Sequence, residues 1–97
     1  MRRTREDGDD VTDLRLREAD LHWREIDGEV IALEARSSTY VATNDAGTVL
    51  WRALVAGATL EGLADVLVSA FGIQRDRARA DADRFVAELK AQGLLDR

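Results

Sequence analysis

The hydrophobic pattern changes its period once along the chain, at Asn44, and this change limits the fold more than any other feature. Before Asn44 apolar and polar residues alternate, as in Leu21-His22-Trp23-Arg24, which is the period of a strand with one buried face. After it apolar residues recur three and four positions apart, as on an amphipathic helix. Because the two periods occupy separate halves of the chain, we expect an α+β domain in which an antiparallel sheet precedes the helices.

Turn signals divide the first half of the chain into strands. Asp27-Gly28 is a strong hairpin signal when alternating runs flank it, and Arg36-Ser37-Ser38 is a second turn. Thr39–Thr43 is rich in β-branched and aromatic residues, which favour strands. We therefore expect strands at residues 21–26, 29–35 and 39–43, with Val30, Ile31 and Leu33 as core candidates, and a further short strand is open at 14–17, where Leu14 and Leu16 alternate with arginines.

Three helices are expected in the second half, and each has recognisable ends. Asn44 or Asp45 can cap the first helix with a side-chain oxygen, and Thr59 can cap the second. Glycine ends each helix, at positions 57, 72 and 93. The third helix, residues 75–92, carries the apolar stripe Ala78, Ala82, Phe85, Val86 and Leu89, and Leu94-Leu95 is expected to fold back onto it.

The chain lacks the residues that catalysis and metal binding need. It has no cysteine and one histidine, His22, whereas structural zinc requires four ligands. Nucleophilic catalysis requires a nucleophile, a base and an orienting group, and Ser37, Ser38 and Ser69 lie in no recognisable nucleophile motif. We therefore predict a protein that is not an enzyme and has no metal site and no cofactor.

Charge and hydropathy limit where the protein can be located and what it can bind. The net charge of −5 disfavours general nucleic-acid binding, which depends on neutralising phosphates. No apolar run approaches the roughly 20 residues that span a bilayer, and the charged start does not fit a secretory signal. The absence of cysteine fits a reducing cytoplasm. We predict a cytoplasmic protein with a flexible N-terminal tail at residues 1–13 and one domain at 14–97.

The third strand has the features of a docking edge. Between Ser37 and Asn44 there is no charged residue and no proline, although edge strands usually carry such protection. An unprotected edge can accept a guest strand, unless a neighbouring element covers it. The third helix offers a second wall for such a site on either of two flanks, one with Arg77, Asp81, Arg84 and Glu88, the other with Arg79, Asp83, Val86 and Lys90.

An ordered set of short motifs resembles a known family over about residues 20–95. An aromatic-containing strand runs into Asn44, and Thr43 before it stands where a larger aliphatic residue is usual. The further motif positions are Gly47, Leu50-Trp51, Gly57-Ala58-Thr59, Asp81, Phe85-Val86, Leu89 and Gly93-Leu94-Leu95. The set is similar to the PqqD-like family of RiPP recognition elements, where RiPP denotes a ribosomally made and post-translationally modified peptide.

The resemblance implies a winged-helix-like fold, with a three-stranded antiparallel sheet followed by three helices. It implies that the leader segment of a precursor peptide adds antiparallel to the third strand and lies between that strand and the third helix. At 97 residues the chain is most similar to the stand-alone leader-binding proteins of lasso-peptide biosynthesis, which hand the precursor to a leader peptidase and a cyclase. The implied partners are the leader peptide of the precursor, the leader peptidase and the cyclase, with no nucleic acid and no membrane. The protein is expected to be a monomer.

Two alternatives remain open at this stage. One is a PqqD-type peptide chaperone for a radical SAM enzyme, and the other is a winged-helix regulator that binds DNA. The second helix argues against the regulator because residues 59–71 contain no basic residue that could contact bases or phosphates. The expected peptide-binding residues are Ser38, Thr39, Tyr40, Val41, Ala42, Arg77, Asp81, Arg84, Phe85 and Val86.

Overall fold

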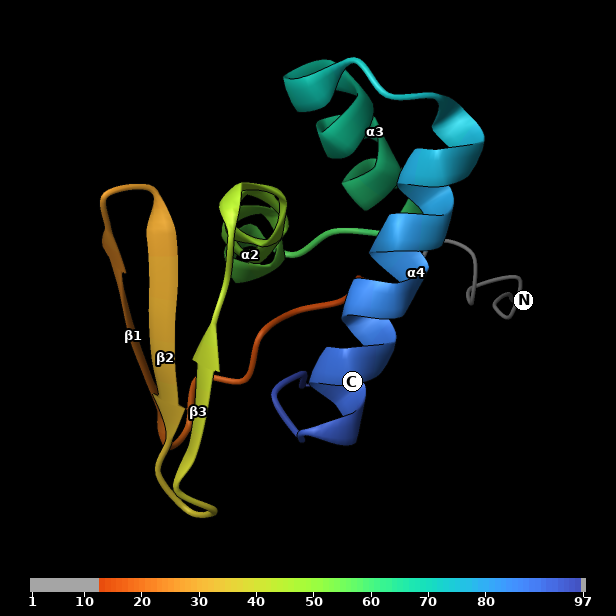
Figure 1. Ribbon diagram of the computed structural model, residues 1–97. Coiled ribbons are helices and arrows are strands. Elements are labelled where there is room, and N and C mark those ends of the chain that lie inside the picture. Colours follow the sequence, from red (N-terminus) through yellow and green to blue (C-terminus); the bar gives the residue numbers. More distant parts are fainter. Residues whose placement is uncertain (1–12, 97) are drawn as a thin grey trace, which may run out of the picture.

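The computed structural model describes residues 13–96, so the predicted N-terminal tail lies outside the described residues except for Asp13. The fold is the predicted one: a three-stranded antiparallel sheet is followed by three helices (Figure 1). The elements are β1 (Leu21–Ile26), β2 (Glu29–Glu34), β3 (Thr39–Ala42), α2 (Asp45–Ala56), α3 (Leu60–Phe71) and α4 (Arg75–Ala91).

The sheet has the strand order β1-β2-β3, and α2 lies between it and the pair formed by α3 and α4 (Figure 1). In β2 the residues that face α2 are Val30 and Ala32, and both are buried. Ile31 lies on the opposite face with 44% of its surface exposed, and Leu33 shares that face. The expectation that Ile31 and Leu33 belong to the core was therefore wrong, because neighbouring residues of a strand point to opposite faces.

The helix ends follow the local chemistry of the sequence. Asn44 Oδ1 accepts a hydrogen bond from the Gly47 N–H at 3.1 Å, and Thr59 Oγ1 accepts one from the Gly62 N–H at 3.0 Å. Each cap satisfies a backbone donor that has no partner within its helix. Both capping predictions that fixed where α2 and α3 begin are confirmed.

The core joins the sheet to the helices through α2. Trp51 is fully buried and meets the partly exposed Trp23 of β1 edge-to-face, with ring centroids 5.9 Å apart. Leu94 is also fully buried, as expected of the segment that folds back after α4. Phe71, the last residue of α3, is 44% exposed.

Residues 14–17 do not add a strand to the sheet. Leu14 forms an isolated antiparallel bridge with Ala58, and Leu16 forms one with Leu95. Both leucines are buried, and these bridges attach the segment before β1 to the ends of α2 and of the chain. The alternation in this segment therefore reflects one buried side rather than membership of a sheet.

A buried carboxylate ties the same segment to β2. Glu34 Oε2 lies 2.5 Å from Arg17 Nη2, and Arg17 Nη1 also donates to the Gly93 carbonyl at 2.7 Å. Glu34 Oε1 accepts from the Ser37 hydroxyl at 2.6 Å and from the Ser37 N–H at 2.9 Å. The two Ser37 hydrogen bonds favour the ionised form, and with the Arg17 charge they lower the pKa of Glu34 from 4.5 to about 2.

Candidate functional site

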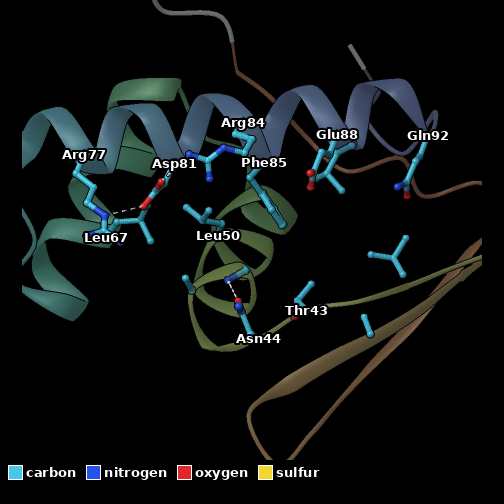
Figure 2. Close-up of a pocket in the computed structure, with 15 residues that line it drawn as sticks. Thr43, Asn44, Leu50, Leu67, Arg77, Asp81, Arg84, Phe85, Glu88 and Gln92 are labelled. Carbon is cyan, nitrogen blue, oxygen red and sulfur yellow. Dashed lines mark hydrogen bonds and ion pairs between the residues drawn. The ribbon is translucent and has the colours of Figure 1, made fainter.

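A groove separates the end of β3 from α4 (Figure 2). It has a volume of about 440 Å³ and is partly open to solvent. β3 supplies one side, α2 supplies the floor and α4 supplies the opposite wall. The residues that line it are Val41, Ala42, Thr43, Asn44, Ala46, Gly47, Leu50, Leu67, Arg77, Asp81, Arg84, Phe85, Glu88, Leu89 and Gln92.

The floor of the groove is apolar and depends on Gly47. A Cβ at this position would lie 2.9 Å from Thr43 Cβ and 3.3 Å from Phe85 Cε1. Only glycine therefore allows the first turn of α2 to approach both side chains this closely. Phe85 consequently packs above the start of α2 while remaining partly exposed towards the groove. Because its ring is incompletely covered, it can contact an apolar side chain of a bound segment.

Thr43 joins three elements at the end of β3. Its hydroxyl accepts a hydrogen bond from the Val30 N–H at 3.1 Å and lies 2.7 Å from the Thr48 hydroxyl in α2. Thr43 is 8% exposed, so these bonds satisfy polar groups that water does not reach. The threonine, unusual at this position of the family motif, thus has a structural reason in this chain.

The wall formed by α4 carries alternating charges. Asp81 lies between two arginines, with Oδ2 3.7 Å from Arg77 Nε and Oδ1 3.2 Å from Arg84 Nη2. Glu88 follows one turn after Arg84 on the same face (Figure 2). The half of the wall nearer the start of α4 therefore holds two cations and one anion, and the half nearer its end holds an anion.

The backbone of β3 has one side free for a guest strand. The Thr43 N–H donates to the Val30 carbonyl at 3.0 Å, and the register pairs Val41 with Ala32. Since the polar groups of successive strand residues point to opposite sides, Val41 also faces β2. The N–H and C=O groups of Tyr40 and Ala42 then face outward, and no element in residues 13–96 pairs with them.

The other edge of the sheet differs in its chemistry. β1 carries Arg24 and Glu25, and Glu25 accepts a hydrogen bond from Arg52 Nε of α2 at 2.9 Å. Charged side chains of this kind discourage strand addition. β3 carries none between Thr39 and Ala42, so the two edges are unequal and the unprotected one adjoins the groove.

The structure brings together some of the expected peptide-binding residues and separates others. Val41, Ala42, Arg77, Asp81, Arg84 and Phe85 line the groove. Ser38, Thr39 and Tyr40 precede it along the strand, and the Tyr40 side chain lies on the outer face of the sheet with 73% exposed. The placement of Val86 at the site needs correction, because this residue is 5% exposed and belongs to the core.

None of the residues on the second flank of α4 lines the groove: Val86 is buried, Asp83 and Lys90 are exposed, and Arg79 faces α3. Arg79 pairs with Glu61, and Arg75 Nη2 lies 3.2 Å from Glu61 Oε1 and also pairs with Asp65. These ion pairs engage two arginines at the start of α4. Sequence reasoning also missed groove residues that α2 and α3 contribute, because no local signal indicates which helical residues border a gap; these are Ala46, Leu50 and Leu67.

The described part of the chain also bears on metal binding and membrane insertion. Within residues 13–96 no group of three or more histidine, aspartate or glutamate side chains is arranged to hold a metal ion. In the same part of the chain no helix combines the length and the apolar composition needed to cross a bilayer.

Two solved structures are similar to this chain. The structure of TbiB1 in complex with the TbiA(beta) leader peptide superimposes with a TM-score of 0.77 and 23% identity, over 84% of this chain and 94% of that one. Lasso peptide synthetase B1 complexed with the leader peptide superimposes with a TM-score of 0.74 and 27% identity, over 84% and 95%. The fold is therefore shared with these two leader-peptide complexes.

At the level of sequence, no curated protein matches the chain. A family model does match, and its description is coenzyme PQQ synthesis protein D (PqqD). The match extends over residues 29–95, which includes β2, β3, all three helices and every residue that lines the groove. Because this match covers more than half of the chain, the protein belongs to the PqqD family.

Proposed function

We propose that the protein binds the leader segment of a ribosomally made precursor peptide by strand addition to β3 and delivers it to the leader peptidase and cyclase of a lasso-type pathway. The observation that carries the proposal is the outward-facing backbone of Tyr40 and Ala42, which borders a groove walled by α4. The two similar structures, both solved with leader peptides, support it.

The expected affinity follows from the groups that the site offers. Tyr40 and Ala42 each present one N–H and one C=O, and four new hydrogen bonds contribute about 1 kcal/mol each. Two apolar guest side chains above Phe85 and Leu50 would add roughly 1.5–3 kcal/mol each. Association and ordering of the guest offset part of this gain. Dissociation constants from micromolar to nanomolar are therefore expected.

The same proposal assigns the protein a role without catalysis of its own. The groove is lined by two arginines, two carboxylates and uncharged residues, and it contains neither a histidine nor a serine that could serve as base or nucleophile. The bound segment would therefore leave chemically unchanged, and separate enzymes would modify it. This role fits a cytoplasmic monomer that needs no metal or cofactor.

The family match favours a second candidate, a peptide chaperone for a radical SAM enzyme. Its basis is the family description, which refers to coenzyme PQQ synthesis. Both candidates use the same groove and differ only in the enzyme that receives the peptide. The enzyme whose reaction the protein accelerates therefore distinguishes them.

Peptide selection followed by calorimetry tests the binding step. The distance from Arg77 to Gln92 along α4 is about 22 Å, which roughly seven residues of an extended strand would span. A display library of random peptides of about 12 residues is therefore long enough to fill the groove. We expect enrichment of peptides that bind without metal or nucleotide and that lose affinity on Ala42→Pro. Failure to enrich any peptide, or full binding to the folded Ala42→Pro variant, would refute strand addition on β3.

The delivery step needs a separate assay. A lasso-type precursor and a leader peptidase are mixed with and without the protein, and leader cleavage is followed by mass spectrometry. We expect faster cleavage with the wild type and no acceleration with Ala42→Pro. Acceleration of a radical SAM reaction instead would favour the second candidate.

A further inference from the structure

The charges on the α4 wall have an order that a guest strand would meet in sequence. Two cations, Arg77 and Arg84, flank Asp81 in the first half, and Glu88 lies in the second half. Arg84 donates one hydrogen bond, from Nη2 to Asp81 Oδ1 at 3.2 Å, and its side chain is 67% exposed, so its other N–H groups can still bind a guest carboxylate. Among residues 13–96 no ion pair of Glu88 is found. A cation and an anion are therefore available one helical turn apart.

The direction of the guest follows from the arrangement of the two walls. β3 runs towards the start of α2, whereas α4 runs the opposite way, from Arg77 beside Leu67 to Gln92 beside the sheet (Figures 1 and 2). A strand that adds antiparallel to β3 therefore runs parallel to α4. Its N-terminal part passes the arginines first, and its C-terminal part passes Glu88.

The spacing of the charges matches a strand repeat. Arg84 and Glu88 are four residues apart, which is about 6 Å along a helix axis. Two residues of an extended strand advance by about 6.6 Å, and such residues point to the same face. A guest side chain opposite Arg84 and another opposite Glu88 would thus be residues i and i+2.

We propose that the α4 wall selects guest strands with an acidic residue at position i and a basic residue at i+2, both facing α4. This inference rests on the proposed function and specifies its ligand. Arg84 and Glu88 are then specificity-determining residues, since they set the direction and register of the peptide, while the β3 edge supplies sequence-independent backbone bonds. Complementary charges of this kind contribute more to selectivity than to total affinity.

The test compares selections on two proteins with opposite walls. The random peptide library is selected on the wild type and on the double variant Arg84→Glu/Glu88→Arg. We expect acid-x-base sequences to be enriched on the wild type and base-x-acid sequences on the double variant. Lys90→Glu, an exposed change on α4 outside the groove, serves as the matched control and should retain the wild-type pattern.

Binding of defined peptides gives the magnitude. The best wild-type peptide and its copy with the two charges exchanged are titrated by fluorescence polarisation. At low salt the wild type should prefer the original roughly five- to tenfold, and the double variant should prefer the exchanged copy by a similar factor. Added salt should shrink both preferences, because the screening length falls to about 3 Å at 1 M.

The outcomes separate this inference from the proposed function. Peptides that lose binding on Ala42→Pro but show no charge order, or the reversed order, would overturn the inference alone. Peptides that bind Ala42→Pro unchanged would overturn strand addition itself. Thermal unfolding of the double variant near the wild-type temperature verifies that any change in preference arises in the groove.

Discussion

Proline substitution at two adjacent positions of β3 provides a direct test of the peptide site. Ala42 is exposed and its N–H points away from β2, whereas the N–H of Val41 points towards Ala32. Proline removes the N–H in either case and is tolerated in a sheet only where that group has no partner. Ala42→Pro should therefore impair peptide binding, and Val41→Pro should impair folding.

The magnitudes follow from the bonds that each variant loses. Ala42→Pro removes one of the four outward backbone groups and leaves a guest carbonyl without its donor, a loss of about 1–3 kcal/mol of binding energy. This corresponds to roughly five- to 150-fold in the dissociation constant. Val41→Pro breaks an internal bond to the Ala32 carbonyl and should lower the free energy of unfolding by about 1–3 kcal/mol.

Two measurements on each variant decide the outcome. Calorimetry with the tightest selected peptide gives the affinity, and urea unfolding gives the stability. Ala42→Ser, which keeps the N–H, is the matched control and should bind like the wild type. The backbone direction inferred for β3 would be wrong if two results were found together. The folded Ala42→Pro variant would bind the peptide as tightly as the wild type, and Val41→Pro would lose peptide affinity under conditions where it is folded.

Three further predictions concern the floor of the groove, the buried Glu34 carboxylate and the α4 wall. Gly47→Ala should displace Phe85 and lower the free energy of unfolding by about 1–3 kcal/mol through overpacking, measured by urea unfolding; unchanged stability would contradict the close approach. The pKa of Glu34 is lowered to about 2, so its contribution to stability is complete above about pH 4.5 and is lost as the pH falls towards 2. Glu34→Gln should therefore flatten the dependence of the free energy of unfolding on pH in that window. An unaltered slope at acid pH would refute the assignment. Arg77→Glu should weaken binding of the selected peptides in calorimetry while the melting temperature changes little, because exposed charges usually alter stability by under about 0.5 kcal/mol; the control Lys90→Glu should alter neither, and equal losses on both variants would indicate a general charge effect.

The sequence alone determined the elements and their ends. The change of period at Asn44 separates sheet from helices, and the caps at Asn44 and Thr59 act over three residues. Such features can be predicted from the sequence because the interactions that cause them join residues that are close in the chain. The absence of charged residues from the third strand was likewise evident from the sequence. The family match over residues 29–95 agrees with the motifs from which the family was inferred.

Only the tertiary structure determined which side of each element is buried and which side is exposed or borders the groove. On the helical wheel of α4, Phe85 and Val86 are neighbours in one apolar stripe, yet Phe85 borders the groove and Val86 is buried. In β2, Val30 and Ile31 are equally apolar, but only Val30 faces α2. Periodicity identifies which residues form the apolar stripe of a helix. Which of them are buried and which border the groove depends on how far the neighbouring helices cover that stripe.

The backbone direction of β3 was also beyond the reach of the sequence. Whether Val41 or Ala42 offers its N–H to a guest depends on register, which here is set by the Thr43 bonds to Val30 and to Thr48 in α2. A shift by one residue would exchange the two roles without changing the composition of the strand. The sequence therefore indicated an open edge, and long-range packing of β3 against β2 and α2 determined which atoms that edge presents.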